Sequence, residues 1–133
     1  MLDSHATLTA NLADRIVLAQ ETIDVVDYVP EALVPVGETN SRIPKSRAFW
    51  KDFVLSMPAK GTITRMRMTA HQNATFSWHI GDLNDMMALG CAAAYCDIVV
   101  AENKWGDVLQ RNHRHLHATV ITDVADLPRL LIG

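Results

Sequence analysis

Two short runs of β-branched residues, separated by a helical pattern, constrain the fold of this chain more than any other feature. The first run covers residues 97–101 and the second covers residues 117–122. Residues 104–111, between them, have the spacing of a short helix. Two strands joined through a helix pair in parallel by a right-handed crossover. The sequence therefore predicts an α/β fold with a small parallel sheet.

Helical spacing dominates the rest of the chain. Apolar residues recur at three- and four-residue steps over residues 6–26, which predicts a long amphipathic helix. Further helices are expected at residues 49–54, 59–71, 83–95 and 126–131. Proline and glycine punctuate residues 30–44 and predict a long connection, with a short extended piece at residues 33–36.

Composition and length are those of one globular domain covering residues 1–133. The sequence is 49% hydrophobic and 20% charged, which is ordinary for such a domain. No basic stretch precedes an apolar one at the N-terminus, and no apolar run approaches the roughly 20 residues that span a bilayer. Cys91 and Cys96 have no further cysteine partners, so two buried thiols are expected. We therefore expect a cytoplasmic protein without a membrane segment.

Charge divides the domain into three parts. Residues 1–41, an acidic N-terminal helix and loop, hold one basic and seven acidic residues, giving −6. Residues 42–79, a basic helical segment, hold seven basic residues and one acid, giving +6, and residues 80–133 return to −3. The basic block can steer a polyanion, or it can simply balance the acidic helix.

Three acidic residues are expected to converge in the C-terminal part. Asp82 is placed to cap the helix over residues 83–95, Asp85 lies one turn inside it, and Glu102 follows the first strand. Reactive groups gather beyond the carboxyl ends of strands in an open α/β sheet. Clustered carboxylates suit Mg²⁺ or Mn²⁺, which could activate a water for phosphodiester hydrolysis. The alternative is that these acids only stabilise a helix terminus and a surface turn.

A longer pattern surrounds these acids. Gly81-Asp82-Leu83-Asn84-Asp85 is followed by Tyr95-Cys96-Asp97 and by Val99-Val100-Ala101-Glu102-Asn103-Lys104-Trp105. This pattern resembles the C-terminal half of PIN-like domains, and residues 120–127 are similar to the closing strand and helix of that family. The resemblance covers about residues 57–132. It implies a PIN-like three-layer fold, with helices around a small parallel sheet.

The resemblance also implies an activity and a site. PIN-like domains are metal-dependent endoribonucleases, often found in toxin–antitoxin systems, so RNA and an antitoxin-like protein are the implied partners. Asp85 and Glu102 match site acids of the family that bind Mg²⁺ or Mn²⁺, and Asp82 is an additional acid of the subgroup pattern. Asp97 precedes the strand, at the end opposite Glu102, and is not counted as a ligand.

The sequence also departs from the family. A complete site takes an Asp from the first strand, which Asp3 resembles, and usually a Glu from a central helix, but no Glu lies between residues 39 and 101. Two strands are expected where the family has four or more, so the sheet could be incomplete or truncated. The alternative function is a degenerate module without catalysis that acts in binding or oligomeric assembly. An exposed sheet edge would then favour a homodimer.

The basic segment supplies the expected RNA contacts. Phosphate groups would be held by Lys60, Arg65 and Arg67. Trp78, between the basic block and Asp82, could stack a nucleobase.

The methionine and histidine residues are the last candidates for a binding surface or a metal site. The methionines indicate adaptable core packing or a partner surface. His113, His115 and His117 alternate, so in an extended segment they would share one face and could bind Zn²⁺ or Ni²⁺, the alternative being a solvated loop.

Overall fold

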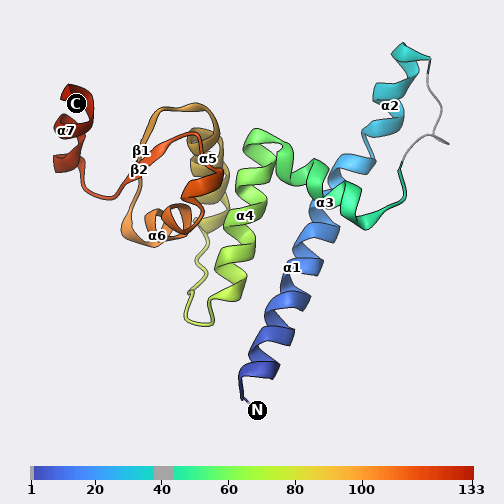
Figure 1. The fold of residues 1–133 in the computed structure, drawn as a ribbon, viewed down its shortest axis with the longest axis horizontal. Helices are drawn as coiled ribbons and strands as arrows, with labels where there is room; N and C mark the ends of the chain where they lie inside the picture. Colours follow the sequence, from blue (N-terminus) through green and yellow to red (C-terminus); the bar gives the residue numbers. More distant parts are fainter. Residues whose placement is uncertain (1, 38–43) are drawn as a thin grey trace.

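The computed structural model describes residues 2–37 and 44–133, without the side chains of residues 2–8 and 10. Figure 1 shows a mostly helical molecule in which a small sheet lies near the C-terminus. In chain order the elements are α1 (Leu2–Val26), α2 (Val29–Leu33), η1 (Val34–Val36), α3 (Arg47–Ser56), α4 (Pro58–Gln72), α5 (Asp82–Tyr95), β1 (Ile98–Val100), α6 (Asn103–Arg111), η3 (His113–His115), β2 (Thr119–Ile121), η4 (Val124–Asp126) and α7 (Leu127–Ile132).

The sheet confirms the α/β prediction. β1 and β2 pair in parallel, with Ile98 opposite Thr119 and Val100 opposite Ile121. α6 connects them, as a crossover between parallel strands requires. Figure 1 shows α5 and α6 beside the strands and α4 between this unit and α1. Among the described residues the sheet has two strands, so each of them has a single strand partner.

The helices predicted from apolar spacing are confirmed, but the extended piece predicted at residues 33–36 is wrong. Those residues belong to the end of α2 and to η1. Pro30 and Pro35 lie in the first turns of these two helices, where a missing N–H costs nothing. The prolines therefore start short helices here. Gly37, with φ of 70°, ends η1 and donates its N–H to the carbonyl of Val34.

The core lies between α4, α5, α6 and the sheet. Its buried members are Ile63, Met66, Met86, Ala93, Val99, Ala101, Trp105, Val108, Leu109 and Ala118. Glycines allow the closest approaches: a Cβ on Gly90 of α5 would collide with the Ile63 side chain of α4, and one on Gly106 of α6 would collide with Thr122. These two positions fix how near α6 and α5 lie to their neighbours.

Several polar side chains join α1 to α4. The Glu21 carboxylate accepts hydrogen bonds from Nζ of Lys60 at 2.6 Å and from Arg67 at 2.7 Å. Gln72 of α4 donates to Asp14 of α1 at 2.8 Å. A partly buried set of ion pairs, together with the buried Val17, therefore holds α1 against the domain.

Two features bear on the earlier expectations about cysteines and membranes. Cys91 and Cys96 are both exposed, so the prediction of buried thiols is wrong. The small residues of α5, including Gly90 and Ala93, face the core instead, and Cys96 lies just beyond the end of the helix. In the described ranges, no helix is both long and apolar enough to cross a membrane.

Candidate functional site

The first turns of α5 and α6 lie side by side and are joined by a partly buried ion pair. Nζ of Lys104 donates to the two carboxylate oxygens of Asp82 at 2.8 and 2.6 Å and to the carbonyl of Ser77 at 2.7 Å. Asp82 is 4% exposed, and Lys104 also lies 4.6 Å from the ring centre of Phe76. Lys104 therefore joins α6, α5 and the loop before α5.

Asp82 does not cap α5 in the way the sequence suggested. Gly81 is the N-cap residue and Asp82 is the first helical residue. Its carboxylate accepts the backbone N–H of His79 in addition to the bonds from Lys104. The hydrogen bonds from Lys104 hold the pKa of Asp82 below its ordinary value, against the opposing effect of burial. Asp82 is a buried, ionised anchor with its oxygens already engaged.

Unlike Asp82, both Asp85 and Glu102 are exposed to solvent. Asp85 lies one turn inside α5, and Glu102 is the N-cap residue of α6 without a side-chain capping bond. Neither carboxylate has a hydrogen bond or ion pair within the described part of the chain. Mg²⁺ commonly binds through one or two carboxylates together with water and substrate phosphates. The carboxylate oxygens of Asp85 and Glu102 are therefore accessible to a ligand from solvent.

Comparison with known proteins adds no residue to this site. The sequence matches no protein-family model, no curated protein and no solved structure. Within residues 2–37 and 44–133, no three His, Cys, Asp or Glu side chains are grouped so that they could hold a metal ion. A metal ligated by Asp82 would have to displace Lys104.

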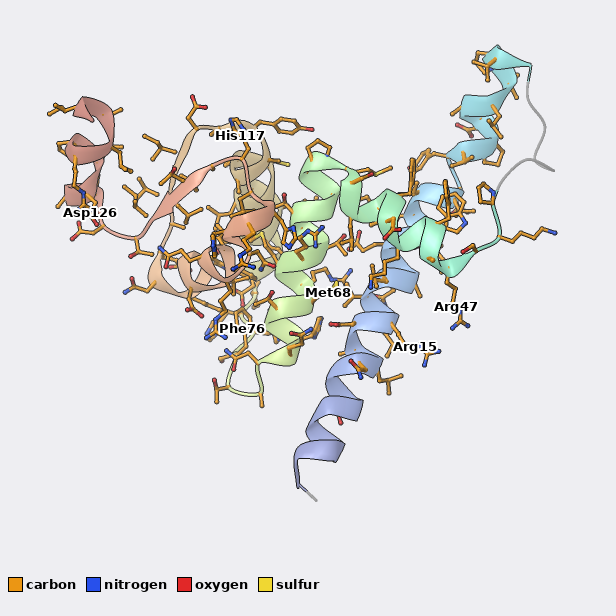
Figure 2. All side chains as sticks on the ribbon, in the orientation of Figure 1. Arg15, Arg47, Met68, Phe76, His117 and Asp126 are labelled. Carbon is orange, nitrogen blue, oxygen red and sulfur yellow. The ribbon has the colours of Figure 1, made fainter. Side chains whose placement is uncertain are left out.

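The remaining acids lie elsewhere. Asp97 precedes β1 and lies 3.2 Å from Nε2 of His117, at the end of the strand opposite Glu102. Figure 2 shows His117 and Phe76 at opposite ends of the C-terminal unit, and Phe76 lies at the Lys104 end. Asp3 is part of α1, a helix and not a first strand.

The predicted phosphate-binding residues are split between two sides of α4. Lys60 and Arg67 share one face, where both bind Glu21. Burial raises the pKa of Glu21, but the hydrogen bonds from Lys60 and Arg67 outweigh it and leave the pKa below its ordinary value. Arg65 projects to the other side, given the 100° step of a helix, and burial lowers its pKa. Lys60 and Arg67 are therefore neutralised within the fold.

Trp78 lies at the mouth of an apolar groove. Its side chain is half exposed, with the rings of His71 and Phe76 at 5.1 and 4.9 Å between centres. The groove has a volume of about 750 Å³ and runs between α1, α4 and α5. Its apolar lining is formed by Ala59, Ile63, Leu83, Met86 and Met87. The methionines thus serve both the core and an open surface.

The alternating histidines do not share one face. Residues 113–115 form the 3₁₀ helix η3, and His113 and His115 are exposed. Their side chains therefore point in different directions, as the threefold repeat of such a helix dictates. The extended geometry that a Zn²⁺ or Ni²⁺ site would need is not formed at these residues.

Lys104 is the residue at this site that sequence reasoning missed. A cation in the first turn of a helix is disfavoured by the helix dipole, and Lys104 occupies that turn of α6. In the sequence, that unfavourable placement indicated that an acidic side chain elsewhere in the chain compensates the charge of Lys104. Asp82 is that acidic residue.

Replacing Lys104 by methionine is expected to lower the free energy of unfolding by about 1.5–2 kcal/mol. Methionine keeps the apolar contact with Phe76, but it leaves Asp82 buried with the His79 N–H alone. Urea unfolding at neutral pH measures the change. Arg111→Met is the control, since it breaks an exposed ion pair with Asp107 on the same helix and should cost less than about 0.5 kcal/mol. Equal effects of the two substitutions would contradict a structural role for the Lys104 ion pair.

Proposed function

We propose that the first turns of α5 and α6 form the site of a PIN-like, metal-dependent endoribonuclease that hydrolyses RNA phosphodiester bonds. The observation that supports this proposal is the ion pair between Lys104 and Asp82. It holds the two helix starts together, and Asp85 in the first turn of α5 and Glu102 at the N-cap of α6 are both exposed. In this proposal, the two-stranded sheet with α5 and α6 is the C-terminal part of a three-layer PIN-like fold.

Each residue has a distinct role in the proposed site. Asp85 and Glu102 bind one Mg²⁺ or Mn²⁺, and Asp82 positions α5 through Lys104. The bound ion would lower the pKa of a coordinated water and offset negative charge on the scissile phosphate. Arg65 and Trp78 are the proposed RNA contacts, since Lys60 and Arg67 are engaged by Glu21.

RNA cleavage in the presence of Mg²⁺ or Mn²⁺ tests the proposal. Asp85→Asn and Glu102→Gln are expected to lower the cleavage rate by about 100-fold or more, because each removes a ligand charge. EDTA should abolish cleavage. Asp107→Asn is the matched control, since Asp107 is an exposed acid of α6 paired with Arg111. Cleavage that survives EDTA and both site substitutions would overturn the proposal.

A non-catalytic binding or assembly module is the second candidate. Two observations favour it: Lys104 engages the carboxylate of Asp82, so two of the three predicted metal ligands remain available, and the described sheet has two strands. In this case the chain would bind a second copy or an antitoxin-like protein. A folded chain that shows no metal-dependent cleavage of any RNA offered would favour this candidate over the nuclease.

A further inference from the structure

The most apolar face of α1 points away from the rest of the chain. Leu12, Ile16 and Ile23 are 55%, 50% and 60% exposed, and Ala19 is also exposed. We call these four residues the α1 seam. At 100° per residue they lie on one side of the helix. The buried residues Val17 and Glu21 lie on the other side.

The spacing of the α1 seam is that of a two-stranded coiled coil. The steps of four, three and four residues place Ile16 and Ile23 at a positions and Leu12 and Ala19 at d positions of a heptad. β-branched residues at a with leucine at d favour a parallel pair, and the small Ala19 permits close approach. In an ordinary surface helix, such an apolar stripe packs against the core of the same domain. Here the domain packs against the opposite face.

We propose that α1 binds α1 of a second copy of this chain, in parallel, through the α1 seam. The seam carries no charge, so two identical faces can meet without desolvating an ionised group. Figure 1 shows the N-terminal half of α1 extending beyond the other helices. Figure 2 shows Arg15 on the side of α1 that faces away from α4.

The residues that flank the seam are compatible with a parallel pair. Arg15 and Thr22 lie along one edge, and Gln20 and Asp27 lie along the other. A parallel pair places each residue of the first edge opposite the residue five positions later in the second copy. Arg15 then meets Gln20 and Thr22 meets Asp27, so no like charges face each other. The heptad spacing and the absence of facing like charges therefore favour a second copy as the occupant.

The size of the seam sets the expected strength. α1 has 25 residues and is about 38 Å long at 1.5 Å per residue, but the seam from Leu12 to Ile23 covers only about 17 Å. A stable interface usually buries about 800 Å² on each partner. The dimer is therefore expected to dissociate on dilution, in the micromolar range.

The molar mass of the full chain, measured by light scattering or sedimentation across micromolar concentrations, tests this proposal. The wild type should approach twice the monomer mass as concentration rises, and Ile16→Asp should remain monomeric throughout. Leu131→Asp, which changes an exposed apolar residue of α7, should dimerise as the wild type does. Circular dichroism of each variant shows whether α1 remains helical. Because Ile16 is half exposed, its substitution does not disturb the core.

A cross-linking experiment tests the parallel orientation. With Cys91 and Cys96 replaced by serine, Ala19→Cys should form a disulfide-linked dimer on mild oxidation, because d positions face each other in a parallel pair. A wild type that stays monomeric, or a dimer that persists in Ile16→Asp, would overturn the proposal. The second result would indicate a dimer through another surface, such as the sheet edge. A mixed complex formed only with another protein would overturn it too.

Discussion

Replacing Trp105 by alanine is expected to lower the free energy of unfolding by about 3–5 kcal/mol, the largest effect of any single substitution proposed for this protein. The indole is fully buried in the core. It packs edge to face against Phe76 at 5.3 Å between ring centres and lies 6.3 Å from Trp78. Alanine would leave a cavity at the junction of α6 with the loop before α5. Urea unfolding followed by circular dichroism measures the loss.

Trp105→Phe separates packing from hydrogen bonding at this position. The indole Nε1 of Trp105 is buried without a hydrogen-bond partner among the described residues. Phenylalanine removes that unsatisfied donor and keeps most of the ring contact, so we expect a loss of about 1 kcal/mol or less. A loss as large as that of Trp105→Ala would contradict this account, because it would mean that the indole N–H itself is needed.

Replacing Glu21 by alanine is expected to lower the free energy of unfolding by about 2–3 kcal/mol at neutral pH. The substitution removes the carboxylate shared by Lys60 and Arg67, each about a quarter exposed, and leaves Lys60 with the exposed Asp24 at 3.6 Å and Arg67 with the amide oxygen of Gln20. The cost is smaller than for a fully buried pair, because water still reaches both cations. Asp52→Ala is the control, since Asp52 is an exposed acid of α3 and should change stability by less than about 0.5 kcal/mol.

Glu21 also makes the free energy of unfolding depend on pH. The hydrogen bonds from Lys60 and Arg67 outweigh burial and hold the pKa of Glu21 below its ordinary value, so the unfolded chain takes up a proton at higher pH than the folded one. The stabilisation by Glu21 is then complete above the unfolded pKa of about 4.3 and is lost as pH falls through the lower folded value. In acid titrations the wild type should lose stability more steeply than Glu21→Ala. Parallel curves would contradict the ion-pair assignment.

Local sequence pattern was enough to predict most of the elements. Spacing, local composition and turn signals depend on neighbouring residues, so α1, α3, α4, α5 and the two strands could be predicted from them. The parallel pairing followed from the helix between the strands. The error at residues 33–36 arose because proline breaks a helix in its interior but is accommodated in its first turn.

Long-range contacts could not be predicted in the same way. Glu21 resembles an ordinary surface acid in a helical pattern, yet it is 39 residues from Lys60 in sequence and buried against it. Likewise, spacing identified the apolar stripe of α1 but not which face the domain would cover. At the candidate site, sequence placed Asp82 near the end of the sheet, but its partner Lys104 lies 22 residues away. Only the packing of α5 on α6 brings these two together.

The polar contact between α1 and α4 also has a consequence for local unfolding. Ion pairs and hydrogen bonds at Glu21, Asp14 and Arg67 join α1 to α4, while the core cluster lies within residues 63–118. Detaching α1 would expose Val17, which is 2% exposed in the fold, but it need not open the core cluster. Amide hydrogens of α1 should exchange with solvent faster than those of α5 and α6, and more so in acid, so that the chain loosens in two steps.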